Sequence, residues 1–122
     1  MPCGPQAKGF CMNFNGYYWK RMSRDSQATF ITAYGEAADT VLRALRPKAE
    51  DQEIGEFHSL FEPLGDLDEE IAGLDEFYTT PENLGVPISR ALQVLARKKS
   101  GEDAATVQRQ VEKFRKEADT FK

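Results

Sequence analysis

Residues 66–100 read DLDEEIAGLDEFYTTPENLGVPISRALQVLARKKS, and this stretch decides the fold. Its first part has apolar residues three or four apart and acidic residues at its start, which favours a helix ending at Tyr78. The segment 87–100 has the same spacing and carries three basic residues, Arg97, Lys98 and Lys99, near its end. Gly101 follows it, and a glycine at that place typically closes a helix in the left-handed conformation. Two helices joined by a turn therefore predict an all-α fold.

The connection between these two helices carries the signals of a short turn. The Thr-Pro pair at 80–81 is a typical N-cap and first helical residue, so a single turn is expected at 81–83. We expect the Asn83 side chain to cap backbone groups in this turn and Pro87 to set the entry angle of the next helix. Gly85 is expected to adopt a backbone conformation that other residues avoid.

Helical patterns also flank this central stretch. A short helix or turn is expected at 14–22. A long helix is expected from Ser23, a good N-cap residue, to about Arg46, because Pro47 stops it. Two more helices are expected at 51–62 and 102–121. The apolar stripe of the long helix contains Phe30, Ile31, Tyr34, Ala38, Val41, Leu42 and Leu45. The seam of the last helix contains Val107, Val111, Phe114, Ala118 and Phe121.

These elements predict a compact bundle of four to five helices over residues 14–122, preceded by an irregular arm at 1–13. The arm holds Cys3 and Cys11, which either form a disulfide or remain free thiols. No signal peptide is visible, so the chain is expected in the periplasm or outside the cell if one has been removed, and otherwise in the cytoplasm. No apolar run approaches the ~20 residues needed to cross a bilayer, and we expect no membrane insertion.

Charge is strongly segregated along the 122 residues, although the net charge is only −4. Residues 50–82 carry twelve acidic residues and no Lys or Arg, whereas 1–24 carry four basic residues and no acidic ones. Residues 83–122 carry nine basic residues against five acidic ones. The acidic stretch would repel nucleic acid, so no such partner is expected. Either it packs beside the basic ends of its own chain or it forms an acidic face for a basic protein partner.

The sequence offers little chemistry for catalysis. One His and two Cys nearly exclude a His/Cys metal site, and we expect neither metal nor cofactor. His58 falls on the apolar side of its predicted helix, which favours a core position. The densest carboxylate group lacks the spacing of a calcium loop, and capping of a helix by Asp66 or Asp68 accounts for it. A non-enzyme is therefore expected.

Two surfaces are candidates for binding a protein: the acidic stretch and an aromatic surface near Tyr17 and Trp19. The alternative is a small-ligand carrier with a pocket around Trp19, Tyr34 and Tyr78, or an enzyme that pairs Glu56 with Asp75. The candidate binding residues are Tyr17, Trp19, Tyr34, Glu56, Asp66, Asp68, Glu69 and Tyr78.

A set of residues spread over 13–115 resembles a group of small bacterial helical proteins of unknown function, which are often exported. The residues that carry the resemblance are Asn15-Gly16, Trp19, Phe30, Tyr34-Gly35-Glu36, Ile71, Leu74-Asp75, Phe77-Tyr78, Pro81, Asn83, Val86-Pro87-Ile88 and Ala91-Leu92. More distantly, the chain is similar to the immunity proteins of type VI secretion, helical proteins that neutralise a toxin by covering it. The resemblance implies no catalytic residues. Together with the missing catalytic motifs, it favours a non-catalytic domain that binds another protein or serves as an accessory subunit.

Overall fold

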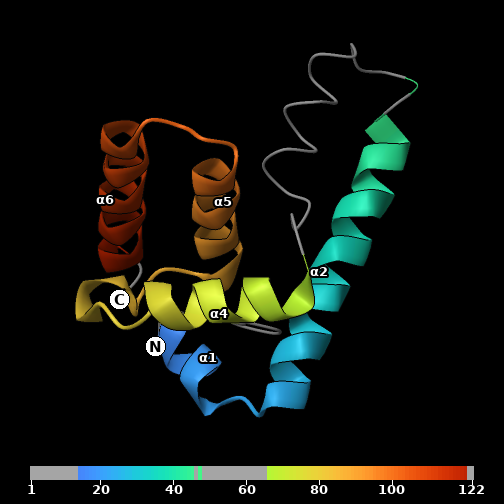
Figure 1. The fold of residues 1–122 in the computed structure, drawn as a ribbon, viewed down its shortest axis with the longest axis horizontal. Coiled ribbons are helices and arrows are strands. Elements are labelled where there is room, and N and C mark those ends of the chain that lie inside the picture. The colour runs from blue at the N-terminus through green and yellow to red at the C-terminus, as the bar shows by residue number, and fades with distance from the viewer. Residues whose placement is uncertain (1–13, 46, 48–65, 121–122) are drawn as a thin grey trace.

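The computed structural model describes residues 14–45, 47 and 66–120 (Figure 1). Over these residues the protein is all-α, as predicted, and contains no strand. The elements are α1 (Gly16–Arg21), α2 (Arg24–Leu45), α4 (Leu67–Phe77), the 3-10 helix η1 (Pro81–Asn83), α5 (Ile88–Lys99) and α6 (Ala104–Thr120). No helix in this part of the chain is both long and apolar enough to span a membrane.

The helices form a bundle organised around α4. Figure 1 shows α5 and α6 antiparallel and side by side, with α4 running across one end of the pair and α2 passing the far end of α4. In agreement with this view, α4 packs against both α2 and α5, and α6 packs against α5 and η1. Helix α1 lies below α4, on the side away from α5 and α6 (Figure 1).

The core lies where α4, α5 and α6 meet the loop before α5. Its largest fully buried side chains are Trp19, Tyr78, Phe114, Ile71, Leu74, Ile88, Val86 and Val94. The seam predicted for the last helix is buried at Val107, Val111 and Phe114. Burying each such side chain contributes about 1.5–3 kcal/mol, so this core provides most of the driving force for folding.

Three of the predicted helix ends are confirmed by their hydrogen bonds or backbone angles. The Ser23 hydroxyl accepts a hydrogen bond from the Ser26 amide at 3.1 Å, and the Asp66 carboxylate accepts one from the Glu69 amide at 2.8 Å. Gly101 has a φ of 83°, in the left-handed region. Helix α6 begins at Ala104 rather than at 102, because Asp103 accepts a hydrogen bond from the Thr106 amide at 3.2 Å and so acts as its N-cap.

The expected conformation of Gly85 and part of the expected apolar stripe of α2 are wrong. Gly85 does not have a positive φ, and a Cβ there would lie 3.5 Å from the Ala118 Cβ, an ordinary contact. On α2, Val41 and Leu45 are exposed because the C-terminal turns of this helix extend past α4 (Figure 1). The helix expected at 51–62, His58, Phe121 and both cysteines lie outside the described residues.

Candidate functional site

The residues just before and at the start of α1 meet the loop between α4 and α5 at one junction, where α1 docks against this loop. The Gly16 amide donates a hydrogen bond to the Leu84 carbonyl at 2.9 Å, and the Ile88 amide donates one to the Phe14 carbonyl at 2.6 Å. Asn15 caps α1 by accepting a hydrogen bond from the Tyr18 amide. These bonds hold the short α1 helix in a fixed position on the bundle.

Trp19 and Tyr78 are core residues of this junction. Trp19 is 1% exposed and donates its indole N–H to the Asp75 carboxylate at 2.8 Å. Tyr78 is 0% exposed and donates its hydroxyl to the Val86 carbonyl at 2.7 Å. Each ring can be buried at little cost because its single polar group has a hydrogen-bond partner. Trp19 therefore does not belong to an exposed docking surface. The Asp75 carboxylate, which the sequence analysis paired with Glu56, accepts the hydrogen bond from Trp19.

Tyr34 lies half-buried on α2. Its hydroxyl group is buried and makes no hydrogen bond to any of the described residues. Burial is the main reason that the pKa of Tyr34 rises to about 12; the nearby Glu70 raises it further, and Arg90 acts in the opposite direction. The structure thus places Tyr34, like Tyr78, in a desolvated environment.

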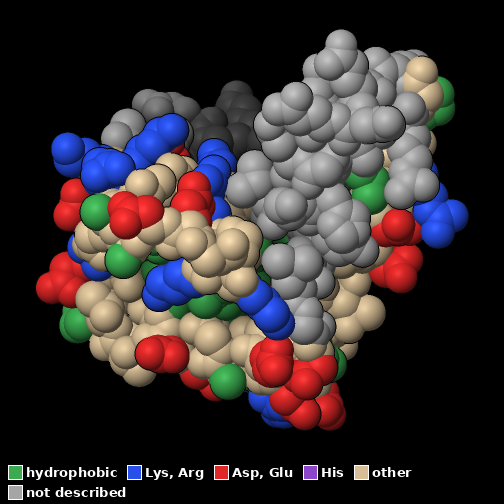
Figure 2. All heavy atoms as spheres, turned by 45° about the horizontal axis from the view of Figure 1, so that its top comes forward, with side chains coloured by type: hydrophobic (Ala, Val, Ile, Leu, Met, Phe, Trp, Pro, Cys, Tyr) green, Lys and Arg blue, Asp and Glu red, His purple; other side chains and the backbone are tan. Residues whose placement is uncertain are grey.

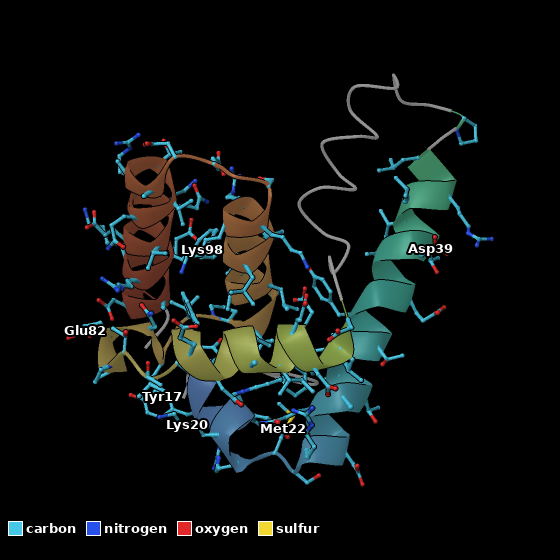
Figure 3. All side chains as sticks on the ribbon, in the orientation of Figure 1. Tyr17, Lys20, Met22, Asp39, Glu82 and Lys98 are labelled. Atoms are coloured by element: carbon cyan, nitrogen blue, oxygen red, sulfur yellow. The ribbon has the colours of Figure 1, made fainter. Side chains whose placement is uncertain are left out.

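The outer side of α1 carries an exposed group of aromatic and basic side chains, which we call the α1 surface: Tyr17, Tyr18, Lys20 and Arg21. Tyr17 and Tyr18 are 57% and 42% exposed. The Tyr18 ring packs edge-on against the Phe14 ring, with 4.9 Å between the ring centres. The Arg21 guanidinium carbon lies 5.6 Å from the Tyr18 ring centre. Figure 3 shows Tyr17 and Lys20 next to each other on α1. Of the two residues predicted for an aromatic surface, Tyr17 alone is exposed.

The predicted acidic site at the start of α4 is largely engaged within the chain. Asp68 pairs with Arg24 of α2, and Glu69 pairs with Lys99 of α5 at 2.9 Å. The hydrogen bond that Lys99 donates to the Glu69 carboxylate raises the pKa of Lys99. Asp66 caps α4. Within the described residues, the acidic stretch thus packs beside Arg24 and Lys99, which come from the two basic parts of the chain. Glu56, the remaining acidic candidate, lies outside the described residues.

A groove between α4, η1, α5 and α6 was not anticipated from the sequence. We call it the helical groove. It has a volume of about 640 Å³. Figure 2 shows hydrophobic side chains in a hollow on this part of the molecule, with charged side chains around it. The lining residues are Gly73, Glu76, Phe77, Thr79, Thr80, Asn83, Leu95, Lys98, Glu102, Ala104, Val107, Gln108, Val111 and Arg115.

Asn83 and Arg115 give this groove an ordered polar end. Asn83 is 5% exposed, and its amide nitrogen donates to the Phe77 carbonyl at 2.9 Å, which fixes the orientation of the side chain. The opposite oxygen accepts a hydrogen bond from Arg115 Nε at 2.7 Å. Asn83 was correctly expected to bond to backbone, but the carbonyl that it satisfies belongs to the end of α4. No sequence pattern pointed to Arg115, since it lies 32 residues away on another helix.

Comparison with protein families, curated proteins and solved structures gives no match. Among residues 14–45, 47 and 66–120, no group of three or more His, Cys, Asp or Glu side chains is placed to hold a metal ion. The candidate sites are therefore the α1 surface and the helical groove.

Proposed function

We propose that this protein is a non-catalytic binding domain, or accessory subunit, that docks another protein on the α1 surface. The observation that carries the proposal is the pair of exposed tyrosines, Tyr17 and Tyr18, beside Lys20 and Arg21. Tyrosine and arginine are enriched among the residues that dominate binding energy at interfaces. Tyrosine provides a large contact area at a low cost in side-chain entropy.

The way α1 is anchored also supports this proposal. The Trp19–Asp75 hydrogen bond and the Gly16–Leu84 backbone bond fix α1 on the bundle. A surface that is already ordered loses little conformational entropy when a partner binds, so more of the contact energy becomes affinity.

The charge of the α1 surface indicates the chemistry of the partner. Residues 14–24 contain basic residues and no acidic ones, and Arg24 is already paired with Asp68. Lys20 and Arg21 therefore favour a partner whose contact surface is acidic. The sequence alone suggested a basic partner, which would have to bind the acidic stretch. We favour the α1 surface instead, because Asp68 and Glu69 of that stretch already form ion pairs within the chain.

Capture from an extract of the source organism at low salt tests the proposal. Four baits are compared: the wild-type chain, the variants Tyr17→Ser and Arg21→Glu, and a control. The control, Lys113→Glu, changes an exposed cation on α6. We expect a protein that the wild type and Lys113→Glu retain, with affinity reduced about tenfold or more by either α1 substitution. Equal retention by all four baits, or retention by none, would contradict the proposal.

A further inference from the structure

The helical groove is a second site, distinct from the protein-binding function proposed for α1. Its volume of about 640 Å³ lies within the roughly 300–1,000 Å³ range of small-molecule pockets. Buried hydrophobic side chains from two helices contribute to its lining: Phe77 from α4, and Val107 and Val111 from α6. Such a lining suits the apolar body of a ligand.

Arg115 is the group in this groove best prepared to bind an anion. Its Nε is held by Asn83, and Asn83 is in turn held by the Phe77 carbonyl, so the guanidinium has a fixed position before any ligand arrives. Among the described residues, no hydrogen bond or ion pair engages its two Nη groups. A guanidinium edge with free N–H donors matches the two oxygens of a carboxylate.

The other charges in the groove favour a single negative charge on the ligand. Lys98 also lines the groove, and Figure 3 shows it between α5 and α6. Both carboxylate oxygens of Glu102 accept hydrogen bonds from Arg97, at 3.1 and 3.2 Å, which leaves Glu76 of α4 as the opposing charge in the lining. Two cations against one carboxylate leave one net positive charge. This balance suits a monoanion better than a phosphate dianion.

We propose that the helical groove binds a small apolar molecule with one carboxylate, which Arg115 anchors. The apolar body lies against Phe77, Val107 and Val111. Glu76 repels the carboxylate from the α4 side and so orients it toward Arg115 and Lys98. This places a ligand site away from the pocket that the sequence suggested around Trp19 and Tyr78, which the core fills.

A matched pair of probes tests this proposal on the whole chain. 4-Phenylbutyrate and its neutral amide have the same apolar body and differ in the charge of the head group. Each is titrated into isotopically labelled protein, and the backbone amide signals of residues lining the groove are followed by NMR. We expect the acid to shift the signals of Phe77, Leu95, Val107 and Val111, with a Kd at least about tenfold lower than that of the amide.

Two variants separate the role of Arg115 from a general effect of charge. Arg115→Gln should remove most of the preference for the acid, whereas Lys113→Gln, which removes an exposed cation outside the groove lining, should keep it. The comparison of the two probes on the wild type does not depend on the stability of any variant. Equal affinity for the acid and the amide, shifts confined to residues outside the groove, or no binding at millimolar concentration would each overturn the proposal. None of these results bears on the α1 surface.

Discussion

Gly16 is the residue at which α1 comes closest to the core. A Cβ there would lie 2.4 Å from Tyr78 Cδ1 and 3.0 Å from the Leu84 Cα. The Tyr78 ring is held by its hydrogen bond to Val86, and the Leu84 contact is to backbone, so neither can move away easily. We expect Gly16→Ala to lower the free energy of unfolding by about 1–3 kcal/mol, measured by urea denaturation.

Gly85 provides the matched control for that substitution. Its φ is not positive, and a Cβ would make one ordinary contact with Ala118 at 3.5 Å. Gly85→Ala should therefore be neutral, or stabilising by up to about 1 kcal/mol, because alanine reduces the conformational entropy of the unfolded chain. Similar losses for Gly16→Ala and Gly85→Ala would show that close packing at Gly16 is not the cause.

Tyr34 and Tyr78 allow a second comparison of two matched substitutions. Tyr78 donates a buried hydrogen bond to the Val86 carbonyl, whereas the buried Tyr34 hydroxyl has no partner among the described residues. Tyr78→Phe should cost about 1–3 kcal/mol, because it leaves the Val86 carbonyl unpaired. Tyr34→Phe should be neutral or stabilise by about 1 kcal/mol, because it removes an unsatisfied polar group. Thermal and urea unfolding of both variants check the opposite signs; a larger loss from Tyr34→Phe would refute this account.

At the scale of the element, the start of α4 separates capping from ion pairing. Asp66 accepts the hydrogen bond from the Glu69 amide, whereas Asp68 makes an exposed pair with Arg24. We expect Asp66→Ala to reduce stability by about 1 kcal/mol and Asp68→Ala by no more than about half of that. Urea denaturation at low and high salt distinguishes them, because salt should weaken the effect of Asp68→Ala and leave that of Asp66→Ala nearly unchanged.

The helices themselves were predictable because their signals are local. Ser23 and Asp66 bond to amides three residues away, and Gly101 takes the backbone angle that ends α5. The error at Gly85 has a physical reason: the backbone bond from Val86 to Asn83 closes this loop with ordinary φ angles. A glycine in a turn can be present without requiring a left-handed conformation.

At the scale of the whole molecule, the candidate sites depend on contacts that no local pattern encodes. Trp19 bonds to Asp75 across 56 residues, and Arg115 bonds to Asn83 across 32. The sequence marked Trp19 as a candidate for a surface because nothing nearby indicated its partner. The groove needs α4, α5 and α6 in place before it exists. Charge was more informative: Arg24 and Lys99, from the two basic parts of the chain, meet the acidic start of α4.

The half-buried Tyr34 and the fully buried Tyr78 also make the whole molecule sensitive to high pH. Burial raises the pKa of Tyr34 to about 12 and raises the pKa of Tyr78 as well, whereas both are about 10 in the unfolded chain. Above pH ~10 the unfolded chain therefore loses protons that the folded chain keeps, so the free energy of unfolding falls as pH rises toward the folded pKa values. Urea denaturation at about pH 9 and about pH 11 should show this loss, and Tyr34→Phe should make it smaller. If the free energy of unfolding is the same at both pH values, the tyrosines ionise as freely in the folded chain as in the unfolded one, and the desolvated environment assigned to them is wrong.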